Sequence, residues 1–277
     1  MIRMKKFIAI TIALMLGLTG CSSGVSQEEY DALLEENEAL RQELAQYTGE
    51  DIIQNEEAED SPVAEYDPNA APAAESDFLY VNNGTAVQIN GYQGSGGYVV
   101  IPNEIEGVPV TRIAPGAFEE VKTITGIVLP EKLEYIGDSA FYWAENLTGV
   151  LVIPESVTMI DGHAFQVTDI TGLVIQSDCD IEINAFANID LLEFIYVKDG
   201  CAPRIGSSVF GYSDILTTAV FPDEMIEIED ETFDTCNRMI IYTPAGSFAE
   251  DYANRNFIKV DTAGYNEQVA KYSKVYG

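Results

Sequence analysis

Residues 133–141 read LEYIGDSAF, and residues 157–165 read VTMIDGHAF. The two segments share an isoleucine five residues before the phenylalanine and a small residue directly before it. The same arrangement recurs around six phenylalanines: Phe118, Phe141, Phe165, Phe186, Phe210 and Phe233. Their spacings are 23, 24, 21, 24 and 23 residues. A period of about 20–30 residues is typical of a solenoid in which each repeat forms one coil.

A second part of each repeat predicts a β-strand. It is rich in β-branched residues and is ended by Pro130, Pro154, Gln176, Lys198, Pro222 and Pro244. Strand alternation places Ile124, Ile127 and Leu129 inward and Val128 outward. We expect the phenylalanines to stack from coil to coil. No coil can bury its apolar face alone, so stability comes from contacts between neighbours.

These segments resemble the repeat of the BspA-type leucine-rich-repeat family, which reads roughly L-x-x-I-x-I-P-x-x-V-x-x-I-G-x-x-A-F-x-x-C. The resemblance covers about residues 78–260. It implies an α/β-type leucine-rich-repeat solenoid that is strand-dominated and has about six repeats of 21–24 residues.

The ends of this domain predict two caps. Asn82-Asn83-Gly84 is a strong turn signal, so residues 78–89 are expected to form a hairpin at the N-terminal end. Residues 244–253 resemble the family's capping helix, with Ser247 as the N-cap. A last strand is expected at residues 257–260. The preceding unit, 239–243, is one residue short, which leaves the register of that strand open.

The N-terminus predicts a lipoprotein signal peptide over residues 1–20. Arg3, Lys5 and Lys6 precede an apolar run, which is followed by Leu-Thr-Gly-Cys at residues 18–21. This tetrapeptide resembles the bacterial lipobox and implies a lipid-modified Cys21, which two or more acyl chains would hold stably in the membrane. The alternative is an ordinary secretory signal. We expect a cell-membrane protein, lipid-anchored and facing the cell exterior.

Residues 21–47 are expected to carry the lipidated Cys21 and a separate short coiled-coil helix. Within residues 27–47, heptad-spaced positions are occupied by Tyr30, Leu33, Asn37, Leu40, Leu44 and Tyr47. The segment holds fewer than three heptads, so self-association through it would be weak. The alternative is a lone amphipathic helix or a stiff spacer. Residues 48–77 hold ten acids and no Lys or Arg, which predicts a disordered linker. Residues 261–277 are interpreted as a C-terminal tail.

Composition and motifs argue against nucleic-acid binding and catalysis. The chain has 14 Lys and Arg against 46 Asp and Glu, a net charge of −32 that repels phosphate backbones. Its only histidine, His163, occupies a turn position that other repeats fill with unrelated residues. We therefore predict no catalytic residues, no cofactor and no metal. An acidic cluster in residues 223–234 could be a calcium site, but a solvated acidic face is the simpler interpretation.

Two cysteines could form a disulfide bond. Cys179 and Cys201 each lie three residues past the end of a strand. Equivalent positions on successive coils lie about 5 Å apart, within reach of a disulfide. The alternative is two reduced thiols. Cys236 is expected to pack in the core.

The outward side of the main strands predicts a binding surface. Phe194 shares this side with the residues two positions before each strand end: Val128, Val152, Val174, Tyr196, Val220 and Tyr242. We call these seven residues the outward row. A continuous apolar and aromatic row on a concave face is a candidate site for an unknown protein or glycan ligand. The alternative is that Val and Tyr simply suit strands.

The sequence leaves two hypotheses for function. The first is a non-catalytic binding module, because a lipid anchor, a spacer and a concave repeat surface suit the display of a recognition surface. The family resemblance implies adhesion or protein binding. The second is a structural or envelope-assembly lipoprotein that acts through its coiled-coil segment.

Overall fold

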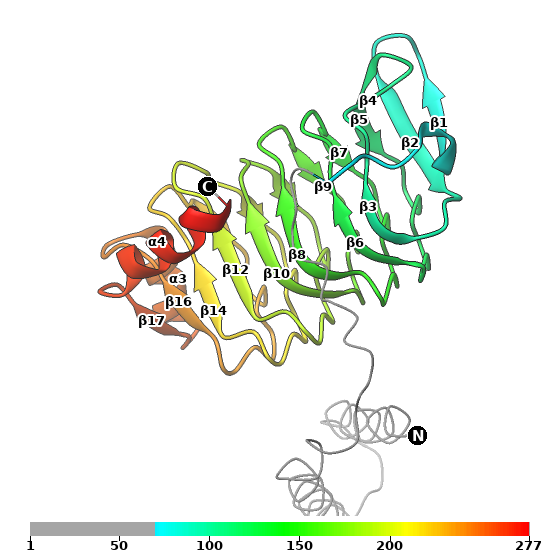
Figure 1. Ribbon diagram of the computed structural model, residues 1–277. Coiled ribbons are helices and arrows are strands. Elements are labelled where there is room, and N and C mark those ends of the chain that lie inside the picture. Colours follow the sequence, from blue (N-terminus) through cyan, green and yellow to red (C-terminus); the bar gives the residue numbers. More distant parts are fainter. Residues whose placement is uncertain (1–69, 277) are drawn as a thin grey trace, which may run out of the picture. The chain divides into compact units, whose positions relative to one another are not determined.

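The computed structural model describes residues 70–276, which form a solenoid of stacked coils (Figure 1). The predicted signal peptide, Cys21, the heptad segment and the linker up to residue 69 lie outside the described residues. Within residues 70–276, no helix is both long and apolar enough to cross a membrane.

The N-terminal cap is the predicted hairpin. Strands β1 (Phe78–Asn82) and β2 (Val87–Tyr92) pair antiparallel, and the Asn83 side chain accepts hydrogen bonds from the backbone of the turn. The folded domain begins upstream of the predicted boundary at Phe78. Ala73 packs against the core and its N–H donates to the Val100 carbonyl at 2.9 Å, and a short 3-10 helix, η1 (Glu75–Asp77), follows.

The coils build two long sheets, one on each side of the core. A second hairpin pairs β4 (Glu104–Ile105) with β5 (Val108–Ile113). The nine-stranded sheet runs β1, β2, β5 and then β7 (Tyr135–Ile136), β9 (Met159–Ile160), β11 (Asp180–Ile181), β13 (Arg204–Ile205) and β15 (Glu227–Ile228), with β4 at the side of β5. Its short strands contain the isoleucines that precede each phenylalanine, paired in register.

The opposite side carries the main strands of the repeats. A six-stranded parallel sheet runs β8 (Thr148–Ile153), β10 (Asp169–Ile175), β12 (Phe194–Val197), β14 (Thr218–Val220), β16 (Ile240–Tyr242) and β17 (Lys259–Asp261). Strands β3 (Gly97–Val100) and β6 (Ile124–Val128) form a separate two-stranded sheet before it. Burial along β6 follows the predicted alternation, with Ile124 and Ile127 buried and Val128 half-buried. The strand-dominated solenoid predicted from the sequence is confirmed.

The predicted phenylalanines form one continuous stack between the sheets, which we call the phenylalanine spine. Centroids of successive rings from Phe118 to Phe233 lie 4.6, 4.7, 5.1, 5.8 and 5.3 Å apart. Their planes differ by at most 18°. Tyr92 extends the stack at the N-terminal end, 5.7 Å from Phe118, and Tyr252 closes it with its edge, 6.2 Å from Phe233.

The turns that present the spine use strained backbone. The residue two positions before each spine phenylalanine has φ between 55° and 67°. This holds even where that residue is not glycine, as at Ser139 and His163. A left-handed conformation costs an L-residue roughly 1–2 kcal/mol. Hydrogen bonds between coils offset this cost; the Phe141 N–H, for example, donates to the Ala164 carbonyl at 2.7 Å. Stacking of the coils therefore overrides local backbone preference.

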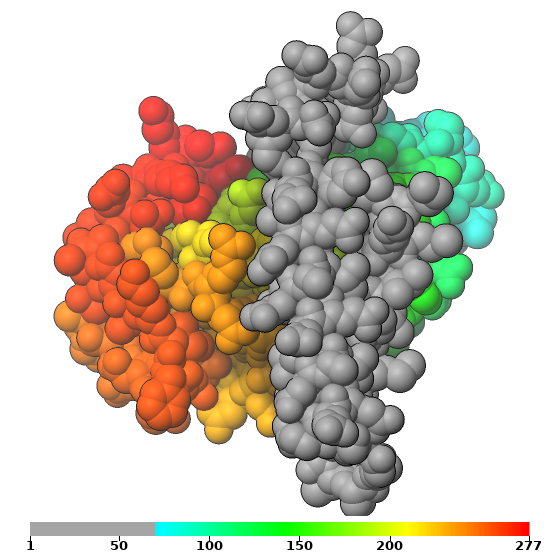
Figure 2. Space-filling model, turned by 90° about the horizontal axis from the view of Figure 1, so that it is seen from below, coloured from blue at the N-terminus to red at the C-terminus, as the bar shows by residue number. Residues whose placement is uncertain are grey.

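The C-terminal end of the domain, orange to red in Figure 2, partly follows the prediction. Helix α3 (Phe248–Arg255) begins after Ser247, whose hydroxyl accepts from the Glu250 N–H at 3.1 Å, so the N-cap is confirmed. Strand β16 pairs in register with β14, which resolves the short unit. The last strand, β17, begins at Lys259 rather than at Phe257, because Phe257 has φ 58° and is 97% exposed.

The segment interpreted as a tail is not a tail. Tyr265–Tyr276 form helix α4, which follows a short connection from β17 and lies over the outer face of the six-stranded sheet (Figure 1). This helix changes the surroundings of the outward row.

Candidate binding surface beneath the C-terminal helix

The outward row is aligned as predicted along the six-stranded sheet. Register pairs Val152 with Val174, Val174 with Tyr196, Tyr196 with Val220, and Val220 with Tyr242. Its remaining strand-end residue, Val128, lies in the two-stranded sheet opposite Val100. The role of the row in binding remains a prediction.

The expectation that the row faces solvent is wrong over most of its length. Val174, Tyr196 and Val220 are at most 1% exposed, and Val152 is 7% exposed. The other three members, Val128, Phe194 and Tyr242, are half-buried. The physical reason is α4, whose Tyr272 packs with the row in a small apolar cluster on the outside of the solenoid.

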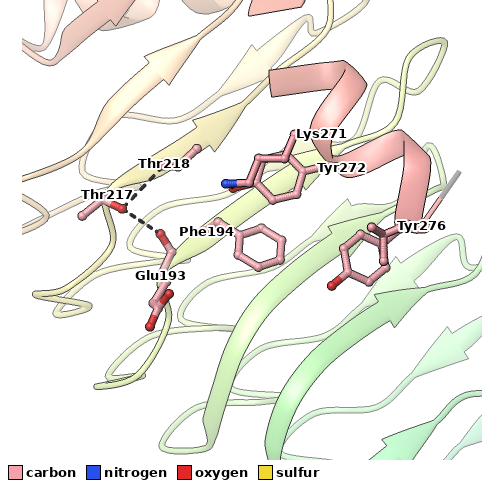
Figure 3. A pocket seen from close by; sticks show the side chains of 8 residues that line it. Glu193, Phe194, Thr217, Thr218, Lys271, Tyr272 and Tyr276 are labelled. Atoms are coloured by element: carbon pink, nitrogen blue, oxygen red, sulfur yellow. Dashed lines mark hydrogen bonds between the residues drawn. The ribbon is translucent and has the colours of Figure 1, made fainter. Parts of the chain in front are cut away.

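Aromatic stacking holds α4 against the sheet. The Tyr272 ring lies 4.6 Å from the ring of Phe194 and 5.6 Å from that of Tyr196, at interplanar angles of 25° and 21°. Tyr276 lies further along Phe194, at 6.3 Å (Figure 3). Gly172 makes this arrangement possible, because a Cβ there would lie 2.3 Å from the Phe194 ring.

Two hydrogen bonds fix the ends of α4. The Tyr265 hydroxyl donates to the Asp199 carboxylate near the start of the helix. At its end, the Gln176 side chain donates to the Tyr276 carbonyl at 2.6 Å. Burial and the hydrogen bond to Asp199 raise the pKa of Tyr265 well above its usual value. Burial also raises the pKa of Tyr196, so both phenols are neutral at physiological pH.

An open pocket of about 320 Å³ remains beside α4. Its lining includes Phe194, Tyr272, Glu193, Thr217 and Lys271 (Figure 3). The Thr217 hydroxyl donates to the Glu193 carbonyl at 3.2 Å, and the Lys271 ammonium lies 4.6 Å from the centroid of the Tyr272 ring. The pocket therefore combines aromatic side chains with charged and hydroxyl groups.

The helix residues that complete this site were missed by the sequence analysis. Tyr265, Val269, Tyr272 and Tyr276 are spaced by 4, 3 and 4 residues and so share one helical face. That spacing was the available signal. It indicates an amphipathic helix that needs a partner surface, although it does not say which surface.

The groups considered for chemistry are dispersed. His163 lies in its turn, 3.5 Å from the Asp138 carboxylate and 3.4 Å from the Asn184 amide. The acids of residues 223–234 are exposed. Among residues 70–276, no group of three or more His, Cys, Asp or Glu side chains is arranged to hold a metal ion.

The predicted disulfide is not formed. Cys179 is buried, Cys201 is half-buried, and both are free thiols. Asp180 pairs with Arg204, so the connection leading to β13 is longer than the one leading to β11, and Cys201 is shifted out of register with Cys179. Burial raises the pKa of Cys179 to about 11. Cys236 is buried as expected and its thiol donates to the Phe210 carbonyl at 3.2 Å.

Comparison with known proteins agrees with the repeat. A family model described as BspA type Leucine rich repeat region matches residues 111–240 in six copies. The resemblance read from the sequence is confirmed over those residues. No curated protein matches the chain.

Solved structures that are similar to the chain include three leucine-rich proteins. A leucine-rich repeat protein of T. pallidum is 23% identical with a TM-score of 0.44, over 62% of this chain and 71% of that one. One from Bacteroides ovatus is 19% identical with a TM-score of 0.40, over 60% and 54%. A leucine-rich cell surface protein of Faecalibacterium prausnitzii is 13% identical with a TM-score of 0.25, over 72% and 96%.

Proposed function

We propose that this protein is a non-catalytic recognition module, anchored to the cell membrane through lipid on Cys21, that binds a partner protein on the outer face of its six-stranded sheet. The partner site comprises the outward row and the pocket beside it. Adhesion to another cell and attachment to a protein of its own envelope are both forms of this function.

The observation that carries the proposal is the contact with α4. The outer sheet face is not a neutral strand surface, because it binds a helix through stacked aromatic rings with centroids as close as 4.6 Å. Aromatic residues that are rigid and partly buried dominate the energetics of protein interfaces. A face that holds a helix of its own chain has the chemistry to hold a segment of another protein.

Display at the cell surface is supported by the sequence. The basic residues, the apolar run and Leu-Thr-Gly-Cys occur in the order of a lipoprotein signal. Replacing Cys21 with Ala should move the protein from the membrane fraction to the medium or leave it unprocessed. Normal processing with full membrane retention would refute the lipid anchor.

Site-specific photo-crosslinking in cells tests the binding surface. A photo-crosslinking amino acid at Thr217, an exposed residue of the pocket, should capture a discrete partner protein. The matched control carries the same amino acid at Glu182, which is exposed beside β11 in the nine-stranded sheet. Identical products from both positions would contradict the assignment of this face.

The same assay distinguishes this proposal from the second hypothesis, a structural or envelope-assembly lipoprotein that acts through its heptad segment. Deleting residues 27–47 removes the heptad segment and leaves the solenoid complete. The proposal expects the Thr217 crosslink to persist after this deletion. Loss of the crosslink would favour envelope assembly through the heptad segment.

A further inference from the structure

Helix α4 covers the outer face of the six-stranded sheet but does not form part of any coil of the solenoid. The last strand, β17, is already paired with β16, so the sheet is complete before α4 begins. Thr262, Ala263 and Gly264 connect the helix to it. Among the residues of α4, only Tyr272 is fully buried.

The connection allows α4 to leave without disturbing the sheet. Gly264 donates its N–H to the Asp261 carboxylate at 2.9 Å, at the point where the chain turns from β17 into α4. A Cβ at Gly264 would lie 2.9 Å from the Asp261 side chain and 3.1 Å from the Tyr242 ring, so the turn is tightly folded there. Opening of this turn would move the helix as a unit and would break none of the β16–β17 pairs.

The forces that hold α4 are few. They include the Tyr272 stack on Phe194 and Tyr196, the Tyr276 contact, the apolar packing of Tyr265 and Val269, and one hydrogen bond near each end. A helix of about 12–15 residues is marginal in water by itself. Undocking and fraying of α4 are therefore coupled, and both uncover the outward row.

We propose that α4 is a displaceable internal occupant of the partner site, and that the partner binds there through an amphipathic helix of the same kind. This inference rests on the proposed function and names its ligand class. In the closed state α4 covers Val174, Tyr196 and Val220, and binding of the partner requires its release. The apparent affinity of the partner is then reduced by the fraction of molecules that are closed.

The face of α4 describes the partner helix. It presents Tyr265, Val269, Tyr272 and Tyr276 on one side. Its charged residues are Glu267, Lys271 and Lys274, a positive balance in a chain whose net charge is −32. The pocket beside it contains Glu193, and Asp199 accepts from Tyr265. The partner helix is therefore aromatic along one face and basic along its flank.

Binding of a synthetic α4 peptide in trans tests the inference without the natural partner. The probe is a fluorescent peptide of residues 262–277, titrated with the full-length protein in detergent and followed by polarisation. We expect it to bind the Tyr272→Ala protein at least tenfold more tightly than wild type, because the internal helix of the variant docks weakly and the sheet face is unchanged.

Two controls make the result specific. Asn266→Ala changes an exposed residue of α4 that does not line the pocket, and the protein should bind the peptide as wild type does. A peptide with the Tyr272→Ala change should bind neither protein. Equal binding of the native peptide to wild type and Tyr272→Ala, or binding of both peptides alike, would overturn the inference.

Two further outcomes distinguish failure of this inference from failure of the proposed function. If the native peptide fails to bind Tyr272→Ala while the Thr217 crosslink is still formed in cells, α4 is a fixed cap and only the proposed function stands. If Tyr272→Ala forms dimers by light scattering that the peptide does not dissociate, the occupant is a second copy of this chain and the partner assignment is wrong.

Discussion

Two aromatic arrays lie on opposite sides of the same strands, and they are sealed in different ways. The phenylalanine spine is inside the solenoid, where each ring is covered by the rings of the neighbouring coils. The rings of Phe194, Tyr196 and Tyr242 are outside, where a single non-repeating helix covers them. The repeat therefore encodes its own interior, whereas the state of the outer array depends on one segment that can move independently.

The largest expected effect is in the spine. Phe165 is fully buried between Phe141 and Phe186, so Phe165→Ala should lower the free energy of unfolding by about 3–5 kcal/mol. Removing a ring from the middle of a one-dimensional stack also uncouples the two halves. Urea unfolding followed by circular dichroism measures the loss. Trp143→Ala, at a turn residue that is 41% exposed, should change it little. Equal losses for the two variants would mean that the spine is not the main stabilising array.

A smaller effect is expected in the outer array. The sequence alone puts Tyr196 on the solvent side, where Tyr196→Ser should leave stability nearly unchanged. It is 1% exposed beneath α4, so we now expect a loss of about 1–2 kcal/mol in the free energy of unfolding. The loss is limited because once α4 leaves, the remaining coils no longer depend on this ring. Tyr142→Ser, beside the spine but away from α4, is the matched control. A loss as large as that of Phe165→Ala would make the outer array part of the core.

Alkaline pH should weaken the contact between α4 and the six-stranded sheet. The pKa of Tyr265 is raised in the folded protein by burial and by its hydrogen bond to Asp199. The stability from this phenol is therefore fully present below its unfolded pKa of about 10 and declines as the pH rises above that value. The rate at which a protease cleaves the C-terminal segment, measured from about one pH unit below to about one unit above this unfolded pKa, checks this. Tyr265→Phe should remove most of the pH dependence; an unchanged pH profile in that variant would exclude Tyr265 as the cause.

The smallest effect on stability is expected from alkylation of the cysteines. Burial raises the pKa of Cys179 to about 11, and Cys201 is half-buried with a pKa raised by burial to a smaller degree. Only the thiolate reacts, so Cys201 should be alkylated by iodoacetamide before Cys179, with little change in stability. Mass spectrometry after timed labelling measures the order. Protection of both thiols until reduction would indicate that they form a disulfide after all.

The sequence was sufficient for features that repeat or that use local turn chemistry. Ring spacing predicted the spine, Asn82-Asn83-Gly84 predicted the hairpin, and Ser247 was found as an N-cap. The sequence was insufficient where tertiary contacts decide whether a side chain is exposed or which residues lie side by side. Exposure of Tyr196 depends on α4, a helix that is held by the sheet face and by residues that follow two of its strands. A disulfide between Cys179 and Cys201 required the connections before β11 and β13 to be equally long, and the one before β13 is longer.

Native-state hydrogen exchange on the wild-type protein tests most directly whether α4 is a removable cover on a solenoid that is stable without it. The account predicts that the amides of α4 exchange through local opening, at a free energy well below that of amides in β10 and β12, and with no dependence on low denaturant. Exchange of α4 amides at the same free energy and with the same denaturant dependence as those strands would contradict it, since α4 would then open only when the whole domain unfolds.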